Sequence, residues 1–142
     1  MTNHLRQSKR GASTMQMVLI LPVLMMLTFG ALDFGYFLFV KNTLVGAAQA
    51  GVRAAMPQAA ANADVATAVN SVMSAAGIDP SNYTITVTPT DITTATPNTK
   101  INVRVSTTWG QVGFTTLSIP YGGINTSKVM AGSASMIKEG TN

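Results

Sequence analysis

The chain contains no cysteine, and its single histidine, His4, lies close to the N-terminus. A disulfide, a thiolate nucleophile and a cysteine-ligated metal are therefore excluded. The lack of histidine after this position also removes a Ser/His/Asp triad and most metal sites from the remainder of the chain. We expect the protein to hold no metal and no cofactor.

Charged residues are scarce as well, at 10% of the sequence, against roughly 25% in a typical soluble domain. The formal net charge is +4, and Arg6, Lys9 and Arg10 all precede the first acidic residue, Asp33. The rest of the chain has no clustered basic face with interleaved aromatic residues, which is the usual footprint of nucleic-acid binding. We therefore expect no nucleic-acid partner.

The sequence also lacks a set of nucleophile, base and orienting group. Asp79 and Asp91 are the one candidate acid pair, but each lies among turn-forming residues, where aspartate usually accepts backbone hydrogen bonds. No Gly-rich phosphate loop with a following lysine is present. We expect no catalytic residue and no small-molecule substrate, so the protein is not expected to be an enzyme.

What the chain does have is a long apolar segment, Met15–Val40, whose only formal charge is Asp33. A helix rises about 1.5 Å per residue, so roughly 20 apolar residues cross a hydrocarbon core about 30 Å thick. The basic residues before the segment predict a cytoplasmic N-terminus. The alternative is a removed secretory signal peptide, but such peptides have a shorter apolar region followed by a small-x-small pattern, which Phe34–Val40 lacks.

The outer end of the apolar segment is rich in aromatic residues, which suit a membrane interface and place Asp33 near the outer boundary. Asp33 has two interpretations. It is either an interfacial carboxylate that is merely tolerated, or a charge that docks onto another subunit, since acids within membranes are usually functional. The aromatic residues are Phe29, Phe34, Tyr36, Phe37 and Phe39.

The next segment, Lys41–Met56, continues the helical periodicity up to Pro57, which ends it. Its apolar stripe is dominated by small residues, which allow another backbone to approach closely. We interpret it as a packing helix, and a plain juxtamembrane stalk is the alternative. The small residues are Gly46, Ala47, Ala50, Gly51 and Ala54.

After a weak joint, a second helix is predicted to begin with Asn62 as its cap and Asp64 in its first turn. Apolar residues recur at helical spacing from Val65 to Ala76, and Gly77 follows as a helix stop. The plain interpretation is a helix that lies on a sheet.

Three strands are predicted from alternation by two: Tyr83–Thr88, Ile101–Ser106 and roughly Lys128–Lys138. The stretch from residue 110 to 127 is a predicted loop that packs or interacts, since it holds five apolar residues: Phe114, Leu117, Ile119, Pro120 and Tyr121. The predicted fold class is α+β, with a long N-terminal membrane helix that extends outward, a second helix and a small antiparallel sheet of about three strands.

Three motifs have a familiar order: Lys9-Arg10-Gly11, then Phe29-Gly30-x-x-Asp33-Phe34-Gly35, then Gly46-Ala47-Ala48-x-x-Gly51-x-Arg53-Ala54. This arrangement resembles the TadE-like family, the minor pilins or pseudopilins of the tight-adherence (Flp) type IV pilus machinery. The resemblance is strongest over residues 9–56. Beyond them it extends only to a pilin-like layout of a helix and Val/Thr-rich strands.

The resemblance implies that a prepilin peptidase cuts after Gly11 and leaves Ala12 as the new N-terminus. The family usually has glutamate at the fifth position after the cut, where this chain has Gln16. Glutamine can accept a hydrogen bond but cannot form an ion pair with a neighbour's free amine. The residues expected to pack in an assembly are Gln16, Phe29, Gly30, Asp33, Phe34, Gly35, Gly46, Ala47, Gly51 and Arg53.

The expected division is a basic cytoplasmic leader at residues 1–11, a membrane helix with its extension at 12–56, and an extracytoplasmic domain at 57–142. The expected function is a pilin-like structural subunit in the bacterial cytoplasmic membrane that supports pilus biogenesis and surface adhesion. Its partners would be other pilins or pseudopilins, the inner-membrane assembly platform, the peptidase and the lipid bilayer. The alternative is a membrane-anchored periplasmic scaffold or binding module of a secretion or envelope complex, outside any filament.

Overall fold

The computed structural model describes the backbone of residues 5–113 and 125–140, and the side chains from Thr14 onward within those ranges. The chain divides into two compact units, and the division falls between Gly35 and Tyr36. Helix α1 (Leu5–Ala54) contributes to both units. The sequence predicted this helix as two consecutive segments.

The first unit consists, in its described part, of the N-terminal portion of α1. Its large apolar side chains face outward on all sides, and those from Met15 to Phe34 that are exposed are between 47% and 74% accessible. A helix that is apolar all round is stable in a membrane and not in water. The helical region Thr14–Ala54 is long and apolar enough to cross a bilayer, in agreement with the predicted anchor.

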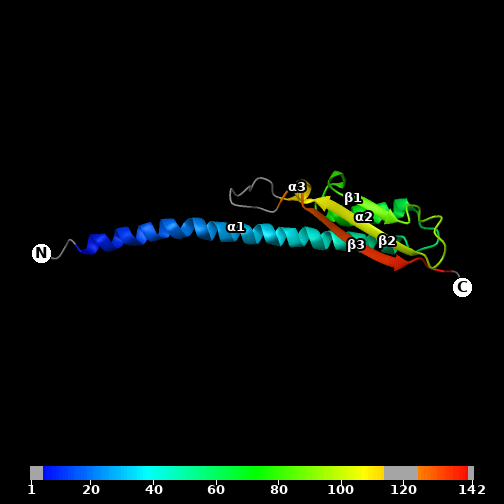
Figure 1. Ribbon diagram of the computed structural model, residues 1–142, viewed down its shortest axis with the longest axis horizontal. Coiled ribbons are helices and arrows are strands. Elements are labelled where there is room, and N and C mark those ends of the chain that lie inside the picture. Colours follow the sequence, from blue (N-terminus) through cyan, green and yellow to red (C-terminus); the bar gives the residue numbers. More distant parts are fainter. Residues whose placement is uncertain (1–4, 114–124, 141–142) are drawn as a thin grey trace. The chain divides into compact units, whose positions relative to one another are not determined.

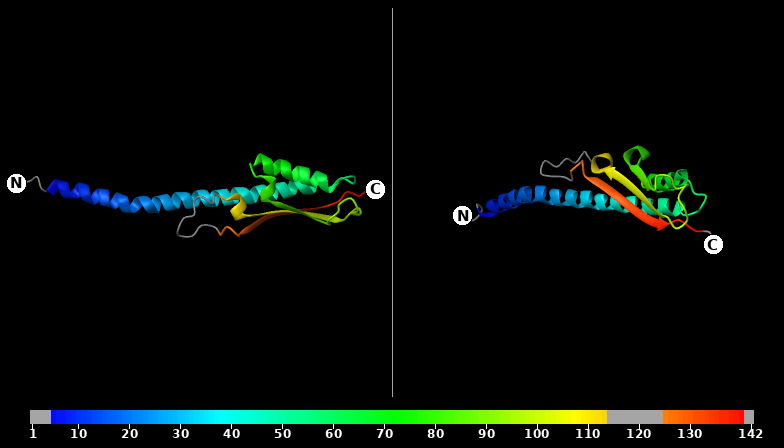
Figure 2. Two further views of the ribbon diagram at one scale, coloured as in Figure 1. Left: turned by 90° about the horizontal axis from the view of Figure 1, so that it is seen from above. Right: turned by 45° about the vertical axis from the view of Figure 1, so that its right-hand side comes forward.

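The second unit is an α+β domain, which confirms the predicted fold class. Its sheet has the order β1-β2-β3, and both strand pairs are antiparallel. The strands are β1 (Thr84–Thr88), β2 (Lys100–Thr108) and β3 (Val129–Ile137), close to the three predicted segments. Helix α2 (Asn62–Ala75) and the later part of α1 cover one face of the sheet (Figures 1 and 2).

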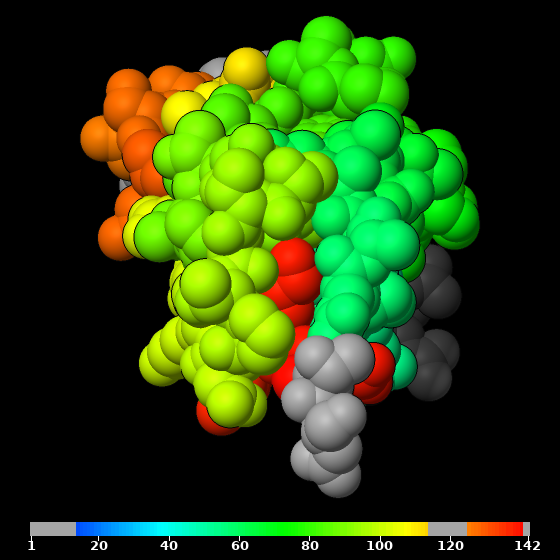
Figure 3. All heavy atoms as spheres, turned by 90° about the vertical axis from the view of Figure 1, so that its right-hand side faces the viewer, coloured from blue at the N-terminus to red at the C-terminus, as the bar shows by residue number. Residues whose placement is uncertain are grey.

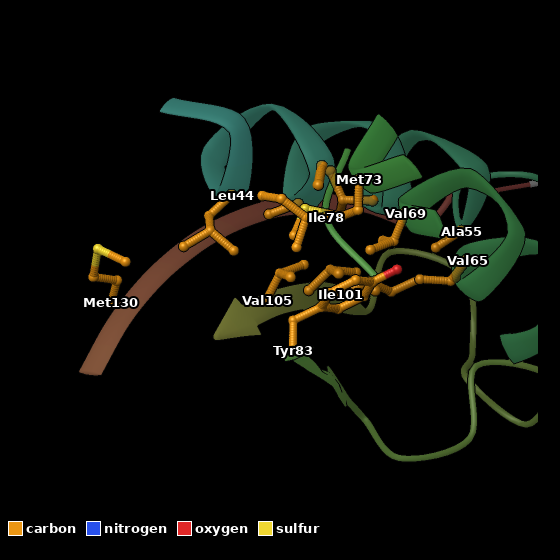
Figure 4. Close-up of a cluster of buried hydrophobic side chains, with 14 of the residues drawn as sticks. Leu44, Ala55, Val65, Val69, Met73, Ile78, Tyr83, Ile101, Val105 and Met130 are labelled. Atoms are coloured by element: carbon orange, nitrogen blue, oxygen red, sulfur yellow. The ribbon is translucent and has the colours of Figure 1, made fainter. Parts of the chain in front are cut away.

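The core lies between that sheet face and the two helices, because the alternating apolar residues of β2 point toward them. Ile101, Val103 and Val105 are at most 1% exposed. They meet Leu44 from α1 and Met73 from α2 in one cluster (Figure 4). Burying such side chains contributes roughly 1.5–3 kcal/mol each, so this cluster is the main stabilising feature of the second unit.

The predicted cap of α2 is wrong by one position. Asn62 is the first helical residue and Ala61 precedes it, with the Ala61 N–H bonded to the Asp64 carboxylate at 2.8 Å. The Asn62 amide is used elsewhere, since it donates to the Thr90 carbonyl at 2.6 Å and accepts from the Ile92 N–H at 3.3 Å. A contact to a segment distant in sequence has replaced the local cap.

The predicted stop at Gly77 is confirmed. Gly77 has φ +74°, a conformation that glycine adopts without the steric cost of a Cβ. Its N–H bonds to the Ser74 carbonyl at 2.9 Å, and the Ile78 N–H bonds to the Met73 carbonyl at 3.0 Å. This is a Schellman motif, which satisfies the last carbonyls of α2. The chain then turns through the 3-10 helix η1 (Pro80–Asn82) into β1.

The predicted loop after β2 begins differently from the expectation. Its start forms a short helix, α3 (Trp109–Val112), and the Trp109 N–H bonds to the Lys128 carbonyl at 2.9 Å. That bond ties the end of β2 to the residue before β3. The apolar residues from Phe114 to Tyr121 lie outside the described residues.

Candidate assembly surface

The residues predicted to pack in an assembly separate into an outward set and an inward set. The outward set includes Gln16 and Phe34, which are exposed, and Phe29 and Asp33, which are half-buried. A Cβ added at Gly30, Gly35 or Gly46 would meet nothing within 4 Å. Arg53 is exposed too. These positions are accessible to lipid or to another subunit.

The inward set consists of Ala47 and Gly51, four residues apart on α1. Ala47 is fully buried, and a Cβ at Gly51 would lie 2.8 Å from Val69 Cγ2 and 3.1 Å from Val103 Cγ1. Gly51 therefore packs against α2 and β2 of its own chain. The contacts of Gly51 lie inside the same polypeptide, and packing of these two residues against another subunit stays a prediction.

Gly132 on β3 makes the closest approach between the sheet and α1. A Cβ at this position would lie under 3.0 Å from the backbone of Leu44 and from the Val45 nitrogen. The sequence pattern alone assigned Gly132 no role. The available signal was a glycine in the interior of a predicted strand, which often marks close contact with another backbone.

An aromatic cluster lies where α1 enters the second unit. The ring of Trp109 is 6.0 Å from that of Tyr36 and 5.6 Å from that of Phe37, between centroids. Trp109 is only 4% exposed. Tyr36 and Phe37 were predicted as part of an interfacial belt, but they pack against the body as well. Trp109 was not predicted, because its partners lie far away in sequence.

Gly113 makes room for the tryptophan. A Cβ at Gly113 would lie 2.5 Å from Trp109 Cε2 and 2.8 Å from Nε1, and the Gly113 N–H bonds to the Trp109 carbonyl at 2.7 Å. The indole therefore lies over its own short helix and leaves no space for a side chain there.

A buried lysine holds the opposite end of the sheet. Lys138 is 3% exposed, and its ammonium donates to the Ile92 carbonyl at 2.5 Å. The backbone of Lys138 also bonds to Asn98 and Thr99, and the next N–H, at Glu139, bonds to the Met56 carbonyl. The residues after β3 thus lie between the joint after α1 and the β1–β2 loop (Figure 3). An ammonium buried in this way requires a bonded partner.

Asp79 and Asp91 serve turns, as their sequence context predicted. The Asp79 carboxylate accepts from Ser81 Oγ at 2.6 Å and from the Ser81 N–H at 2.9 Å. Asp91 accepts from Thr93 Oγ1 and N–H at the same two distances. The hydroxyl bond is the main cause, and the N–H bond the second cause, of a lowered pKa at each carboxyl. Both are fully exposed, which suits a turn and not a catalytic pair.

The lowered pKa of these two carboxyls predicts a loss of stability in acid. The folded state holds fewer protons than the unfolded state between the folded pKa and the ordinary value of about 3.9, so stability rises with pH there. The contribution of these two carboxylates to folding stability is complete at pH values above that ordinary pKa, and it is lost as the pH falls through the folded pKa. We expect the denaturation midpoint to fall from pH 5 to pH 3, and to fall less in the double variant Asp79→Asn/Asp91→Asn. An equal slope in both proteins would contradict the assignment.

The tyrosine at the start of β1 is held by α2. The hydroxyl of this tyrosine, Tyr83, donates a hydrogen bond to Asn70 Oδ1 at 2.7 Å. Burial is the main cause of a raised pKa at Tyr83, with the Asp79 charge as the second cause.

Within the part of the chain that the structure describes, no three His, Cys, Asp or Glu side chains are placed to hold a metal.

Among the residues that the structure describes, the geometry defines a class first: one helix that is long and apolar enough to span a bilayer, and whose later turns are part of the core of a small α+β domain. Comparison with known proteins adds a family match for one segment. Residues 11–53 match the family model described as TadE-like protein, which confirms the predicted resemblance for this segment. Searches of curated proteins and of solved structures gave no match.

Proposed function

We propose that the protein is a membrane-anchored, pilin-like structural subunit of a tight-adherence (Flp) pilus system, with a role in pilus biogenesis and surface adhesion. The supporting observation is that the TadE-like match covers residues 11–53. Within this stretch of α1, large apolar side chains are exposed from Met15 to Phe34, and several side chains from Val40 onward are buried in the core of the second unit. In this proposal α1 supplies the membrane anchor with its earlier part and a core helix of the second unit with its later part.

In this proposal the N-terminus is cytoplasmic and the second unit is extracytoplasmic, because the cations before the apolar segment favour the inside. The partners are other pilins or pseudopilins, the inner-membrane assembly platform and the lipid bilayer. The outward set of α1, with Phe34, Gly35 and Gly46, is available for those contacts. No catalytic role and no cofactor are part of the proposal.

Cleavage by a prepilin peptidase between Gly11 and Ala12 is the part that can be tested first. The full chain with a C-terminal tag is expressed with and without such a peptidase. The expected result is a mass loss equal to residues 1–11 only when the peptidase is present. Gly11→Val is the matched control, since a bulkier side chain hinders entry of that peptide bond into the peptidase cleft. An unchanged mass of the wild-type chain in the presence of an active peptidase would refute the prepilin assignment.

A membrane-anchored scaffold outside any filament is the second candidate, and Gln16 is the observation that favours it. This side chain lacks the charge needed for an ion pair with a neighbour's N-terminal amine. Sheared surface filaments distinguish the two functions. Presence of the tagged protein in the sheared fraction supports a filament subunit, and retention in the membrane alone supports the scaffold.

A further inference from the structure

The end of the second unit that carries α3 has the composition of a membrane interface. Trp109 and Tyr36, residue types typical of interfacial belts, are in ring contact there. The Trp109 N–H bond to the Lys128 carbonyl, 2.9 Å long, brings the start of β3 to the same end. Elements from three parts of the chain therefore meet around one tryptophan.

Exposed apolar side chains belong to residues next to this cluster along the chain. The described part of the second unit exposes five large apolar side chains, and three of them are here: Leu38 at 43%, Phe39 at 47% and Val129 at 59%. Phe39 stacks on Tyr36 with ring centroids 6.0 Å apart. Leaving such side chains in water costs free energy, so a cluster of them marks a contact surface.

Two cations accompany the apolar residues. Lys41 lies one turn of α1 beyond Phe37 and Lys128 immediately precedes Val129, and both are exposed. In contrast, the described carboxylates of the second unit lie on α2, on the turns before and after β1, and after β3, at Asp64, Asp79, Asp91 and Glu139. The combination of exposed apolar side chains, tryptophan and lysine favours a surface with an apolar interior and anionic headgroups.

We propose that this end of the second unit, formed by Leu38, Phe39, Lys41, Lys128 and Val129 around Trp109, docks onto the anionic headgroup layer of the membrane. The occupant follows from two observations: the charge of the two lysines is complementary to anionic lipid, and α1 continues from this surface into the apolar segment. Lipid headgroups surround a membrane-spanning helix on all sides. These residues can therefore contact headgroups when they lie at the same height along α1, even if they point in different directions around it. The inference rests on the anchoring part of the proposed function.

Trp109 supplies the probe, because it is the only tryptophan of the chain. The full-length protein is reconstituted into vesicles of phosphatidylcholine alone or with about 30% phosphatidylglycerol, in both cases with lipids brominated close to the headgroup. Docking brings Trp109 near the bromines and quenches its fluorescence. The expected result is stronger quenching in the anionic vesicles, weakened by salt because screening reduces the attraction of exposed charges.

The lysines are tested with Lys41→Gln/Lys128→Gln. Each basic residue near an anionic surface is worth about 1 kcal/mol, so the ratio of docked to undocked protein is expected to fall about fivefold per lysine. The matched control is Lys100→Gln/Arg104→Gln, which removes two exposed cations from β2, away from Trp109. The control is expected to keep the quenching of the wild type.

Insertion is measured separately, by resistance of the protein to alkaline extraction from the vesicles. An extractable protein would overturn the anchoring on which both the proposed function and this inference depend. The docking surface alone would be overturned if the protein is inserted but Trp109 quenching is the same with and without anionic lipid. The same conclusion would follow if both double variants change the quenching equally. Quenching of Trp109 that changes only with protein density would assign the surface to a second copy of the chain, which also contradicts the inference.

Discussion

Gly132→Ala is expected to lower the free energy of unfolding of the second unit by about 3 kcal/mol, at the upper end of the usual cost of overpacking. The added Cβ would lie under 3.0 Å from the Leu44 and Val45 backbone atoms of α1. A flexible side chain could rotate away, but a helix backbone cannot without breaking its own hydrogen bonds. The strand and the helix must therefore separate, and the core between them opens.

The measurement is urea denaturation of the full chain in detergent micelles, followed by Trp109 fluorescence. Ser133→Ala is the matched control, because Ser133 is the next residue on β3 and is exposed. It is expected to change the unfolding free energy by no more than about 0.5 kcal/mol, as surface substitutions usually do. Equal midpoints for the two variants would show that β3 does not rest on α1 at Gly132.

Leu44→Ala is expected to cost about 3 kcal/mol, within the range of roughly 2–5 kcal/mol for removal of a buried leucine side chain. Leu44 is fully buried and belongs to the cluster of Figure 4. Its loss leaves a cavity between α1 and the sheet. Leu38→Ala, six residues earlier on the same helix, is the control, since Leu38 is 43% exposed. It is expected to change the denaturation midpoint little.

Gly132→Ala and Leu44→Ala can be combined in one double variant. The atoms that a Cβ at Gly132 would meet at Leu44 belong to the backbone and not to the side chain, so Leu44→Ala is not expected to rescue Gly132→Ala. The double variant should be less stable than either single variant by the same measurement. A double variant more stable than Gly132→Ala would show that the leucine side chain, and not the helix backbone, is the obstacle.

The sequence was sufficient where structure follows from local pattern. Alternation by two located the strands, helical spacing located α2, and Gly77 marked its end because a positive φ at that point is a local requirement. The apolar run predicted a helix with outward-facing apolar side chains, and the small-residue stripe predicted close packing at Gly51. Each of these signals lies within a few residues of the feature that it predicts.

The remainder depends on contacts between distant segments. Asn62 has the right residue type for a cap, yet its amide binds Thr90 and Ile92 across the fold. Lys138 has the sequence position of a charged strand end, but it is buried, and its ammonium donates a hydrogen bond to the Ile92 carbonyl. Similarly, the stripe on α1 indicated a partner for Gly51 without indicating that Val69 and Val103 of the same chain fill that role.

The antiparallel order β1-β2-β3 has a consequence for aggregation. Among the residues that the structure describes, β1 and β3 are the edge strands, and they run in the same direction because each is antiparallel to β2. β3 is nine residues long and uncharged, which is the kind of edge that recruits other chains. Antiparallel pairing of two β3 strands requires a twofold axis perpendicular to the sheet, and that axis also reverses the helix lying on it. Copies whose sheet-covering turns of α1 point in the same direction cannot meet in this way, so a shared orientation of the second unit would itself protect the edge.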